Sequence, residues 1–376
     1  MAQELALELL NPSYCGTRIP VMEHPWPLSR EAIQHLTGRD PLREPEHLND
    51  IFQQVATALE IDLLWGGGLP RKGDEIYDWS TGPSVRRNAA GLEVVRWGIF
   101  ATTHQEDGRH FTHVPKPADV PAALAFEPQH YFPESVAEYT TRFTQAYHAM
   151  LASCGRTCLP IPHHYTTCFH WPLAIFGFEL LCEVGMEEEP FADLMTKFAE
   201  ISTRITTAWA QVRDPEGKPL RAFICHDDLT ITSGPIFSPD WYRRYIFPHY
   251  RTIFAPLKAA GIPIIFTSDG NCSAFVDDLL GTAQVDGLNF EYLVDLERLV
   301  RDYPDKILIG NINSAVLASG PLATLEAEVT RCLETGARAR RYVLNVGGGL
   351  THDIPIPHLD AYLKLRKRLC RSIRTA

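Results

Sequence analysis

The chain has 376 residues, of which 45% are hydrophobic and 22% charged, as is ordinary for a globular protein. Its net charge of −11 argues against nucleic acid as a partner, because a phosphate backbone attracts clustered Lys and Arg, and it gives no reason to expect binding to an anionic membrane. No apolar stretch approaches the roughly 20 residues that span a membrane. The nine cysteines contain no Cys-x-x-Cys pair, and acids stand where a signal peptide needs bases, so we expect a cytoplasmic protein with reduced thiols.

Eight short apolar runs are predicted to be β-strands, and amphipathic stretches typical of helices separate most of them. One helix is expected to begin at Ser238, a favourable N-cap, followed by Pro239 at the first helical position. Further amphipathic stretches run over 191–212, 272–280, 321–335 and 357–372. The predicted strands are Arg18–Glu23, Ile61–Trp65, Leu159–His163, Arg221–Cys225, Ile262–Phe266, Val285–Leu288, Ile307–Ile309 and Tyr342–Asn345.

This alternation predicts right-handed βαβ units in an α/β fold, a single (β/α)8 TIM barrel that takes residues 1–376 as one domain. Residues 66–132, between the second and third strands, break the pattern because they are rich in Gly, Pro and charge. They contain strand-like pieces at Leu92–Thr103 and His110–Val114 around the turn signal Gln105–Gly108, which predict an antiparallel β insertion. The insertion is either a lid over the barrel mouth or a surface decoration without a catalytic role.

Polar residues follow nearly every predicted strand, at the end where a parallel barrel keeps its chemistry. The fifth strand stops abruptly at a turn that contains Asp269 and Asn271. Asp269 is a candidate oxygen ligand or acid/base, and Asn271 a candidate binding residue. The alternative is that Asp269 and Gly270 form only a tight turn.

The fourth strand runs into His226, Asp227 and Asp228, which offer an imidazole and two carboxylates for proton transfer or metal ligation. Adjacent Asp side chains in a loop cannot both point the same way, so one of them is expected to face the cavity. We assign His226 and Asp228 to catalysis and Asp227 to binding. The alternative is that the Asp pair caps the following turn.

Other strand ends supply further candidates, each of which could instead be a cap or a packing residue. One of His163 and His164 should face the cavity, because neighbouring side chains of a strand alternate; His164 is the candidate. His170 is interpreted as a cap or packing element at the start of a helix. The remaining candidate binding residues are His24, Trp26, Trp65, Tyr165, Asn289, Glu291, Asn311 and Gly348.

His352 follows the eighth strand, just beyond a triple glycine, and is a candidate catalytic base oriented by Asp353. We expect His226, Asp228, Asp269 and His352 to project toward one cavity. Such a mixed set suits a divalent cation such as zinc, manganese or iron, with His226 and Asp269 as ligands, or a metal-free acid/base site.

From about residue 200 onward, several short motifs occur in an order and spacing that resemble the uroporphyrinogen decarboxylase superfamily. That superfamily also contains corrinoid-linked and cobalamin-related methyltransferases. The resemblance covers about half of the chain and extends weakly to Arg18–His24 and Ile61–Trp65. The motifs are Asp227-Asp228-Leu229, Gly234–Pro239, Phe247–Tyr250, Ser268–Asn271, Gly310–Asn313 and Gly347–Gly349 followed by His352–Pro355.

Departures from the family pattern limit what the resemblance implies. The decarboxylases hold substrate carboxylates with an Arg-containing loop after the first strand, where this chain has Glu23–Pro27, and they use an Asp after the second strand, where Trp65 precedes three glycines. The zinc methyltransferases of the superfamily use a His-x-Cys after the fifth strand and a Cys in the late glycine loop. Here Thr267-Ser268-Asp269 and Gly347–Gly349 occupy those places, so the thiolate ligands are missing.

The resemblance therefore implies a methyltransferase-type enzyme that acts on a small methylated substrate, with a corrinoid protein or a folate-like molecule as methyl carrier. A first alternative is a decarboxylase or lyase acting on a tetrapyrrole or a smaller carboxylic acid, which a positive pocket of Arg71, Arg86 and Arg87 would favour. A second is a non-catalytic ligand-binding barrel. The expected cofactors are a divalent metal such as zinc, a corrinoid-bound methyl group, or both. A homodimer is one oligomeric state that the sequence allows.

Overall fold

The computed structural model describes residues 2–10, 18–83, 85–88, 91–103, 114–165 and 168–372, and the chain divides into two compact units. The first unit comprises residues 1–103, 149–162 and 287–376, and the second comprises residues 104–148 and 163–286. Each unit is therefore built from segments that are far apart in the sequence. Among the described residues, no helix is both long enough and apolar enough to cross a membrane.

The parallel sheet contributes six strands to the first unit, in two groups of three. Strand β2 lies between β6 and β1, and β13 lies between β12 and β14. Val21, just before β1, forms a parallel bridge with Leu344 of β14 and so joins the two groups. The strands are β1 (Met22–Glu23), β2 (Leu63–Trp65), β6 (Leu159–Ile161), β12 (Gly287–Asn289), β13 (Ile307–Ile312) and β14 (Arg341–Val346).

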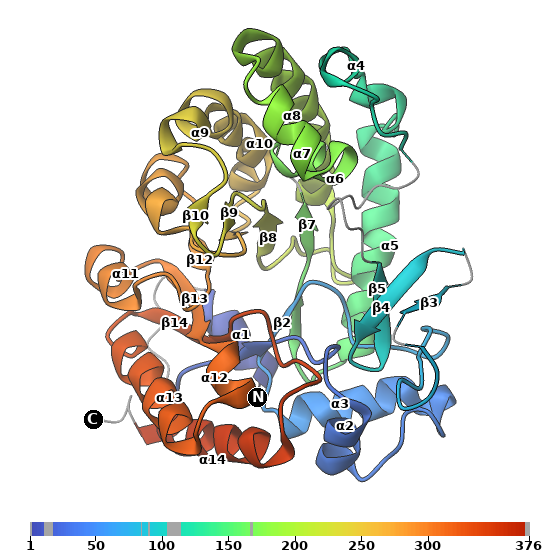
Figure 1. Ribbon diagram of the computed structural model, residues 1–376. Helices are drawn as coiled ribbons and strands as arrows, with labels where there is room; N and C mark the ends of the chain where they lie inside the picture. Colours follow the sequence, from blue (N-terminus) through green and yellow to red (C-terminus); the bar gives the residue numbers. More distant parts are fainter. Residues whose placement is uncertain are drawn as a thin grey trace. The chain divides into compact units, whose positions relative to one another are not determined.

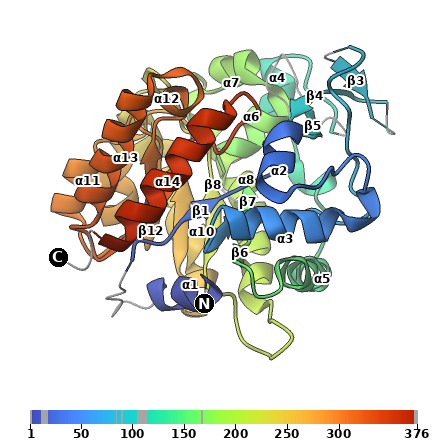
Figure 2. The same cartoon turned by 90° about the horizontal axis from the view of Figure 1, so that it is seen from below.

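Helices pack outside this sheet, because every residue of β13 and β14 is buried and a parallel sheet needs cover on its apolar surface. Helices α13 and α14 lie side by side, and so do α2 and α3 (Figures 1 and 2). The helices of the first unit are α1 (Ala2–Leu9), α2 (Arg30–Thr37), α3 (Leu48–Ala58), α11 (Leu296–Asp302), α12 (Ser314–Ser319), α13 (Leu322–Gly336) and α14 (Ile356–Ser372), with a 3-10 turn, η1, at Pro45–His47.

Three antiparallel strands lie between β2 and β6 in the sequence: β3 (Val85–Arg87), β4 (Glu93–Trp97) and β5 (Phe100–Thr103). The predicted strand Leu92–Thr103 is thus two strands, with a tight turn at Gly98, whose φ is +67°. A Cβ at Gly98 would lie 2.2 Å from the carbonyl oxygen of Trp26, so this turn packs closely against the loop after β1. The predicted turn Gln105–Gly108 and all of the predicted strand His110–Val114 except Val114 lie outside the described residues, and the role of a lid stays a prediction.

The second unit contains three parallel strands, β7 (His163–Tyr165), β8 (Phe223–His226) and β11 (Ile264–Thr267), with β8 in the middle. A short antiparallel hairpin, β9 (Thr230–Ile231) and β10 (Gly234–Pro235), follows β8 (Figure 1). The helices of this unit are α4 (Val120–Leu124), α6 (His170–Phe176), α7 (Phe178–Val184), α8 (Glu188–Gln211), α9 (Pro239–Tyr245) and α10 (Phe247–Ala259). Two 3-10 turns, η2 (Pro128–His130) and η3 (Ser273–Phe275), and a π-helical segment, η4 (Asp277–Thr282), complete the unit, and α5 (Val136–Cys154) contains the boundary between the units.

Helix α8 shows how the sequence produces this packing. Its buried residues recur every three or four positions, which places them on one face of the helix, and this face packs against α10. Ser238 caps α9 as predicted, because its side chain accepts a hydrogen bond from the backbone N–H of Trp241. The face of α8 is made by Phe191, Leu194, Phe198, Ile201, Ile205 and Trp209.

All eight predicted strand regions contain parallel strands, which confirms the α/β prediction, but one of them is divided. The run Leu159–His163 ends as β6 at Ile161, and β7 begins at His163, because Pro162 has no N–H with which to continue a ladder. Strand β6 pairs with β2, whereas β7 pairs with β8. Closure of a complete barrel stays a prediction.

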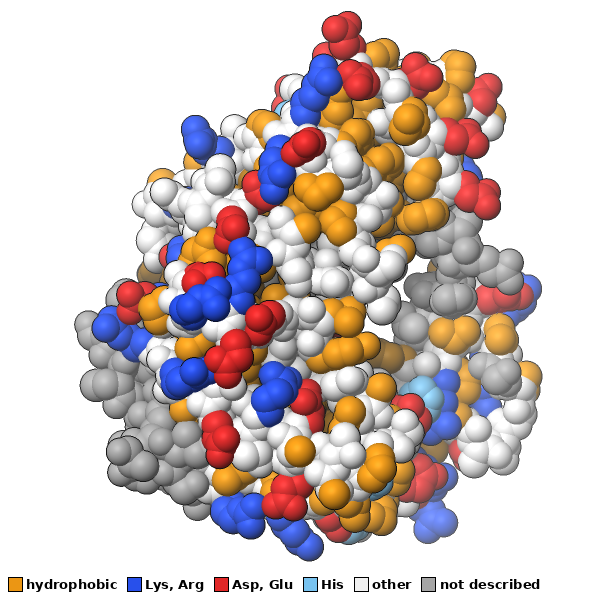
Figure 3. Space-filling view, turned by 60° about the vertical axis from the view of Figure 1, so that its left-hand side comes forward, with side chains coloured by type: hydrophobic (Ala, Val, Ile, Leu, Met, Phe, Trp, Pro, Cys, Tyr) orange, Lys and Arg blue, Asp and Glu red, His pale blue; other side chains and the backbone are white. Residues whose placement is uncertain are grey.

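Charged side chains are distributed without a dominant sign on the face of the molecule shown in Figure 3. Acidic and basic side chains of the described residues are intermingled over much of this face. Such a surface offers no continuous basic stripe there of the kind that tracks a phosphate backbone.

Candidate active site at the ends of strands β7, β8 and β11

The carboxyl ends of the three parallel strands of the second unit lie in register. Tyr165 of β7 is paired with His226 of β8, and His226 with Thr267 of β11. The loops that leave these strands therefore begin at the same level, and they carry Asp227, Asp228 and Asp269. This arrangement agrees with the rule that parallel α/β folds collect functional side chains at the carboxyl ends of their strands.

His226, Asp228 and Asp269 come together as predicted for the ends of strands four and five. The Nε2 atom of His226 lies 2.8 Å from Oδ1 of Asp228 and 3.9 Å from Oδ1 of Asp269. The side chain of His226 is 4% exposed, that of Asp228 22% and that of Asp269 69%. Exposure to solvent thus increases from His226 through Asp228 to Asp269. Asp269 is the most accessible member of the cluster.

Asp227 and Asp228 point in different directions. The buried carboxylate of Asp227 accepts a hydrogen bond of 2.7 Å from the hydroxyl of Tyr250, whereas Asp228 faces His226. The backbone of Asp227 is also tied to β11, because its N–H donates to the carbonyl of Thr267. Asp227, predicted as a binding residue, thus serves the structure of the loop, and Asp228 is the member of the pair that faces the cluster.

A stack of three rings borders the cluster. The Tyr165 ring lies between the imidazoles of His170 and His226, with centroid distances of 3.9 and 4.4 Å and interplanar angles of 16° and 24°. His170 also reaches the carboxylate, since its Nδ1 atom lies 3.3 Å from Oδ2 of Asp228. Asp228 is therefore held between two imidazoles, one at each of its oxygens. The sequence interpretation of His170 as a cap or packing element missed this contact.

Strand β7 also corrects the choice between two histidines. His163 lies next to the cluster, with its ring centroid 5.6 Å from that of His226. His164 is directed elsewhere: its ring lies edge-on to Phe143 at 5.5 Å, and its Nδ1 atom accepts a 3.4 Å hydrogen bond from Trp209. The alternation of side chains was predicted, but the sequence did not reveal which histidine faces the cluster.

The charges within the cluster shift the pKa values of its members in opposite directions. Burial disfavours a charged imidazole, but the hydrogen bond and negative charge of Asp228 outweigh it and raise the pKa of His226. Burial would raise the pKa of Asp228, yet contacts with His170 and His226 hold it well below its usual range. Asp228 is therefore ionised at neutral pH. Loss of hydration and the nearby Asp228 carboxylate both raise the pKa of Asp269. Because this side chain is largely exposed, the neighbouring negative charge is the more important of the two causes.

The geometry of the cluster fits a divalent cation. One ligand atom each from His226, Asp228 and Asp269 lies within 4.8 Å of the other two, close enough to surround one ion. One imidazole nitrogen and two carboxylate oxygens suit zinc, manganese or iron better than a purely thiophilic metal. His226 and Asp269 were the predicted ligands, and Asp228 joins them on the same geometric grounds.

A hairpin holds the turn that presents Asp269. Thr230 of β9 donates a hydrogen bond to the carbonyl of Asp269, and the N–H of Asn271 donates to the carbonyl of Ile231 at 3.0 Å. Gly270 has a φ of +77°, and a Cβ there would lie 2.6 Å from the carbonyl carbon of Ile231. The side chain of Asn271, a predicted binding residue, accepts a hydrogen bond from the N–H of Ser273. Both the turn and the exposed carboxylate that were expected at this position are thus present.

The candidates after strands one and two form an aromatic group within the first unit. The His24 ring lies 5.6 Å from Trp65 and 6.1 Å from Trp26, and Trp26 stacks on Trp97 of β4 at 6.2 Å and 8°. Burial lowers the pKa of His24 to about 4, so this imidazole is neutral. Trp97 was not among the predicted residues, because nothing in the sequence links β4 to the loop after β1.

The remaining candidates also belong to the first unit. A Cβ at Gly349 would lie 2.3 Å from Nε2 of His24, whereas Gly348, with a φ of +73°, faces open space. His352 is half-buried, and its pKa is lowered by burial and by the positive charge of Arg96. Asn289 and Glu291 are likewise half-buried at and just after the end of β12. A common site of His352 with His226, Asp228 and Asp269 stays a prediction.

Asn311 is the candidate that the structure places in the interior. Its side-chain amide donates a 2.9 Å hydrogen bond to the carbonyl of Val294, and its oxygen lies 3.4 Å from a guanidinium nitrogen of Arg331. These contacts with its own unit account for a fully buried amide. A binding role for Asn311 stays a prediction.

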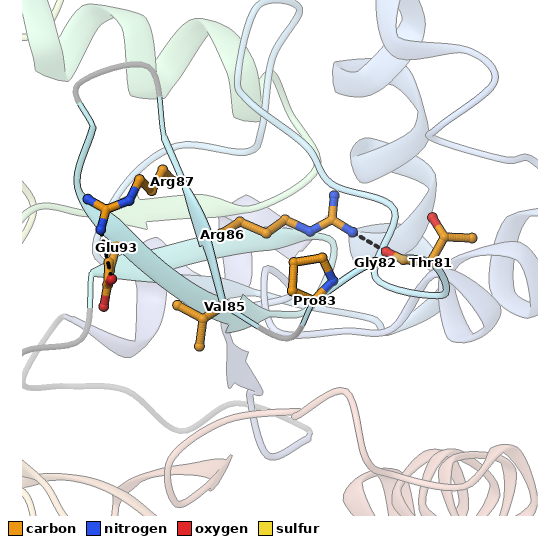
Figure 4. Close-up of a pocket in the computed structure, with 7 residues that line it drawn as sticks. All are labelled: Thr81, Gly82, Pro83, Val85, Arg86, Arg87 and Glu93. Atoms are coloured by element: carbon orange, nitrogen blue, oxygen red, sulfur yellow. Dashed lines mark hydrogen bonds and ion pairs between the residues drawn. The ribbon is translucent and has the colours of Figure 1, made fainter.

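The proposed arginine pocket is only partly formed. Arg86 and Arg87 line a cavity of about 500 Å³ with Glu93, but Arg71 does not line it (Figure 4). Arg87 pairs with Glu93 at 3.0 Å, while Arg86 donates to the carbonyls of Asp78 and Thr81. In Figure 4 the two guanidinium groups point to opposite ends of the cavity. Their charges are thus committed to partners within the protein.

Comparison with known proteins finds a family match over residues 186–369. Residues 186–369 match the sequence model of the family described as Uroporphyrinogen decarboxylase (URO-D). The uroporphyrinogen decarboxylase of Nocardia farcinica is 31% identical over 134 residues, which cover 34% of this chain and 37% of that protein. An enzyme of that name from Thermus thermophilus is 30% identical over 119 residues, covering 31% and 34% of the two chains. The matched part thus spans about a third of the length of these curated relatives.

A solved structure extends the comparison to nearly the whole chain. A methyltransferase from Methanosarcina mazei superposes with a TM-score of 0.62 over 98% of both chains, at 14% sequence identity. At that identity the likeness concerns the fold alone, which is of the α/β class. The family match over residues 186–369, together with the curated relatives, supports a divergent member of the uroporphyrinogen decarboxylase superfamily.

Proposed function

We propose that this chain is a methyltransferase-type enzyme that acts on a small methylated substrate, or passes a methyl group to or from a corrinoid protein or folate-like carrier. The observation that carries the proposal is the cluster of His226, Asp228 and Asp269, whose ligand atoms lie within 4.8 Å of one another at the ends of β8 and β11. One member of this site, Asp269, stands where the resemblance places a thiolate ligand of the zinc methyltransferases after the fifth strand, whereas His226 and Asp228 follow the fourth strand. The likeness to the Methanosarcina mazei methyltransferase supports the fold that such a site needs.

Each member of the cluster has a distinct task in this proposal. A cation bound by the three residues would supply Lewis-acid activation of the group that accepts or releases the methyl. Asp228 stays ionised and holds its position between two imidazoles. Asp269 is exposed and has a raised pKa, so in a metal-free version of the site it is the residue suited to take the proton that the methyl acceptor loses. Nε2 of His226 lies 2.8 Å from the carboxylate of Asp228 and 3.9 Å from that of Asp269, within reach of both.

The curated relatives favour a second candidate function, decarboxylation, because they are uroporphyrinogen decarboxylases at about 31% identity. A porphyrinogen carries several carboxylates, and paired arginines are the side chains best suited to hold them. Arg86 is bound to backbone carbonyls and Arg87 to Glu93, and the loop after β1 has no Arg before Arg30. These observations rank decarboxylation below methyl transfer. A non-catalytic barrel ranks third, since it has no need of an accessible carboxylate such as Asp269.

A spectroscopic assay tests the proposal. Cob(I)alamin and methylcob(III)alamin, which differ strongly in absorbance, are incubated with the protein and a panel of methylated thiols, amines and phenols. We expect turnover with at least one compound, and Asp269→Asn should remove most of it. Asp240→Asn is the matched control, because Asp240 is an exposed carboxylate of α9 that is 93% exposed.

Two other outcomes separate the alternatives. Release of CO₂ from uroporphyrinogen or a smaller carboxylic acid, with no methyl transfer in the panel, would replace the proposal with the decarboxylase function. Methyl transfer that survives Asp269→Asn unchanged would show that Asp269 forms only a turn and that the chemistry lies elsewhere.

A further inference from the structure

His170 lies in the interior of the second unit, beside the candidate active site. It begins α6 and is 1% exposed. The helix is anchored next to it, because the indole N–H of Trp171 donates a 2.9 Å hydrogen bond to Ser202 of α8. The start of α6, which carries His170, is thus held by a contact outside the site. The cap of α6 is Phe169, with no side-chain hydrogen bond, so His170 is not needed as a cap.

The carboxylate of Asp228 has one imidazole at each oxygen. Oδ1 lies 2.8 Å from Nε2 of His226, and Oδ2 lies 3.3 Å from Nδ1 of His170. Two contacts at different oxygens fix the plane of a carboxylate, which a single contact leaves free to rotate. Each oxygen has two lone pairs, so a contact with His170 leaves the carboxylate able to bind a cation as well.

Tyr165 acts as a spacer between the two imidazoles. Its ring is stacked on His170 at 3.9 Å and on His226 at 4.4 Å. Because the three rings are nearly parallel, the two imidazoles approach Asp228 from fixed directions. The residues involved come from α6, β7, β8 and the loop after β8, and all lie within the second compact unit.

We propose that His170 is a positioning residue that orients Asp228 for cation binding through the second carboxylate oxygen. This inference rests on the proposed metal site and deepens it. Metal-binding side chains are commonly held by a hydrogen bond from an outer residue, and loss of that partner typically lowers metal affinity about 10- to 100-fold. His170 is predicted to hold the Asp228 carboxylate in position and not to bind the cation itself.

Two substitutions separate orientation from packing. His170→Phe keeps a ring against Tyr165 and removes the nitrogen that contacts Asp228. His170→Asn gives up the ring but places an amide donor near the position of Nδ1. The control is His249→Phe, at a half-buried histidine of α10 that lines a separate cavity of about 680 Å³ in the same unit.

The readout is the affinity of the chelator-treated full-length protein for Zn²⁺ and Mn²⁺ by titration calorimetry, with the melting temperature of each metal-free protein measured in parallel. We expect His170→Phe to bind about 10- to 100-fold more weakly than the wild type while the metal-free protein still unfolds in one cooperative transition. His170→Asn should bind within a few-fold of the wild type despite its lost stacking, and His249→Phe should match the wild type.

The possible failures are distinguishable. If the wild type binds a cation and His170→Phe binds it equally well, His170 is only a packing residue and the inference is overturned while the metal site stands. If His170→Asn binds as weakly as His170→Phe, a donor at this position does not restore the affinity, which also overturns it. If the wild type binds neither cation, the metal site fails and the inference fails with it.

Discussion

Tyr250 donates a hydrogen bond to Asp227, whereas Asp228, the next residue, lies between the imidazoles of His170 and His226. Two identical side chains, adjacent in sequence, therefore meet different surroundings. Asp227 is enclosed by the loop and by α10, and Asp228 faces the cluster. The direction of each side chain follows from the backbone of the loop, which is tied to β11 by the N–H of Asp227.

This difference predicts that alanine substitutions at the two positions affect different properties, stability at Asp227 and metal affinity at Asp228. Asp227→Ala should lower the free energy of unfolding by about 1–3 kcal/mol, because the buried Tyr250 hydroxyl loses its acceptor. Asp228→Ala should lower metal affinity by more than the roughly 100-fold expected for an outer partner, with a smaller loss of stability. Urea unfolding and cation titration of both variants provide the measurement. Interchanged effects would show that the two residues have been assigned the wrong way round.

The lowered pKa of His164 predicts a pH dependence of the protein's stability. Burial, and to a smaller extent the positive charge of Arg142, lower the pKa of His164 from 6.5 to about 4. Between those two pH values the unfolded chain binds a proton that the folded protein does not, so stability falls as pH drops through this window. The loss from this one residue amounts to at most about 3 kcal/mol.

His164→Asn should make the stability curve flatter. The asparagine oxygen can still accept from the indole of Trp209, but it does not titrate. Urea unfolding between pH 7 and pH 4.5 should show a smaller decline in this variant than in the wild type. Equal slopes for His164→Asn and the wild type would mean that His164 is protonated in the folded protein.

At the scale of elements, the β9–β10 hairpin and the loop after β11 form one unit that presents Asp269. Thr230 and Ile231 of β9 hold the backbone on both sides of Gly270 through hydrogen bonds. The turn is close because Gly270 has no Cβ and adopts a left-handed conformation. The position of the exposed carboxylate therefore depends on a contact between two loops rather than on its own strand.

A pair of glycine substitutions separates this contact from simple backbone strain. Gly270 and Gly261 have φ angles of +77° and +69°, but a Cβ at Gly261 would meet nothing within 4 Å. Gly261→Ala should cost about 1 kcal/mol of stability from the left-handed backbone alone and leave metal binding intact. Gly270→Ala should cost more and also weaken metal binding, because its Cβ would meet Ile231 and displace the turn. Thermal unfolding and cation titration compare the two; equal metal affinity would mean that the hairpin does not position Asp269.

The elements differ in how far the sequence could predict them. Buried parallel strands are continuous apolar runs, so all eight strand regions could be located, and the residues after β8 and β11 followed from them. The division at Pro162 was visible in the sequence, but only the pairing partners show that two strands result. His170 and His163 escaped prediction because the direction of a side chain depends on tertiary packing. Trp97 escaped because its partner, Trp26, is more than 70 residues away in the sequence.

At the scale of the molecule, each compact unit carries its own group of functional candidates. The second unit holds His226, Asp228 and Asp269, with His163, Tyr165 and His170 around them. The first unit holds the aromatic group of His24, Trp26, Trp65 and Trp97, along with His352 and the late glycine loop. The metal site can therefore be tested without reference to the aromatic group.

The most direct test of the account is the metal content of the protein purified without chelators, measured by inductively coupled plasma mass spectrometry. The wild type should carry close to one equivalent of a divalent transition metal, and Asp228→Ala should carry far less at the same yield of folded protein. The ligand atoms of His226, Asp228 and Asp269 lie close enough together to hold one ion, which is the basis of this expectation. Less than about a tenth of an equivalent in the wild type, with no uptake when zinc, manganese or iron is supplied, would contradict the metal site. Equal metal content in the wild type and Asp228→Ala would place any bound metal elsewhere.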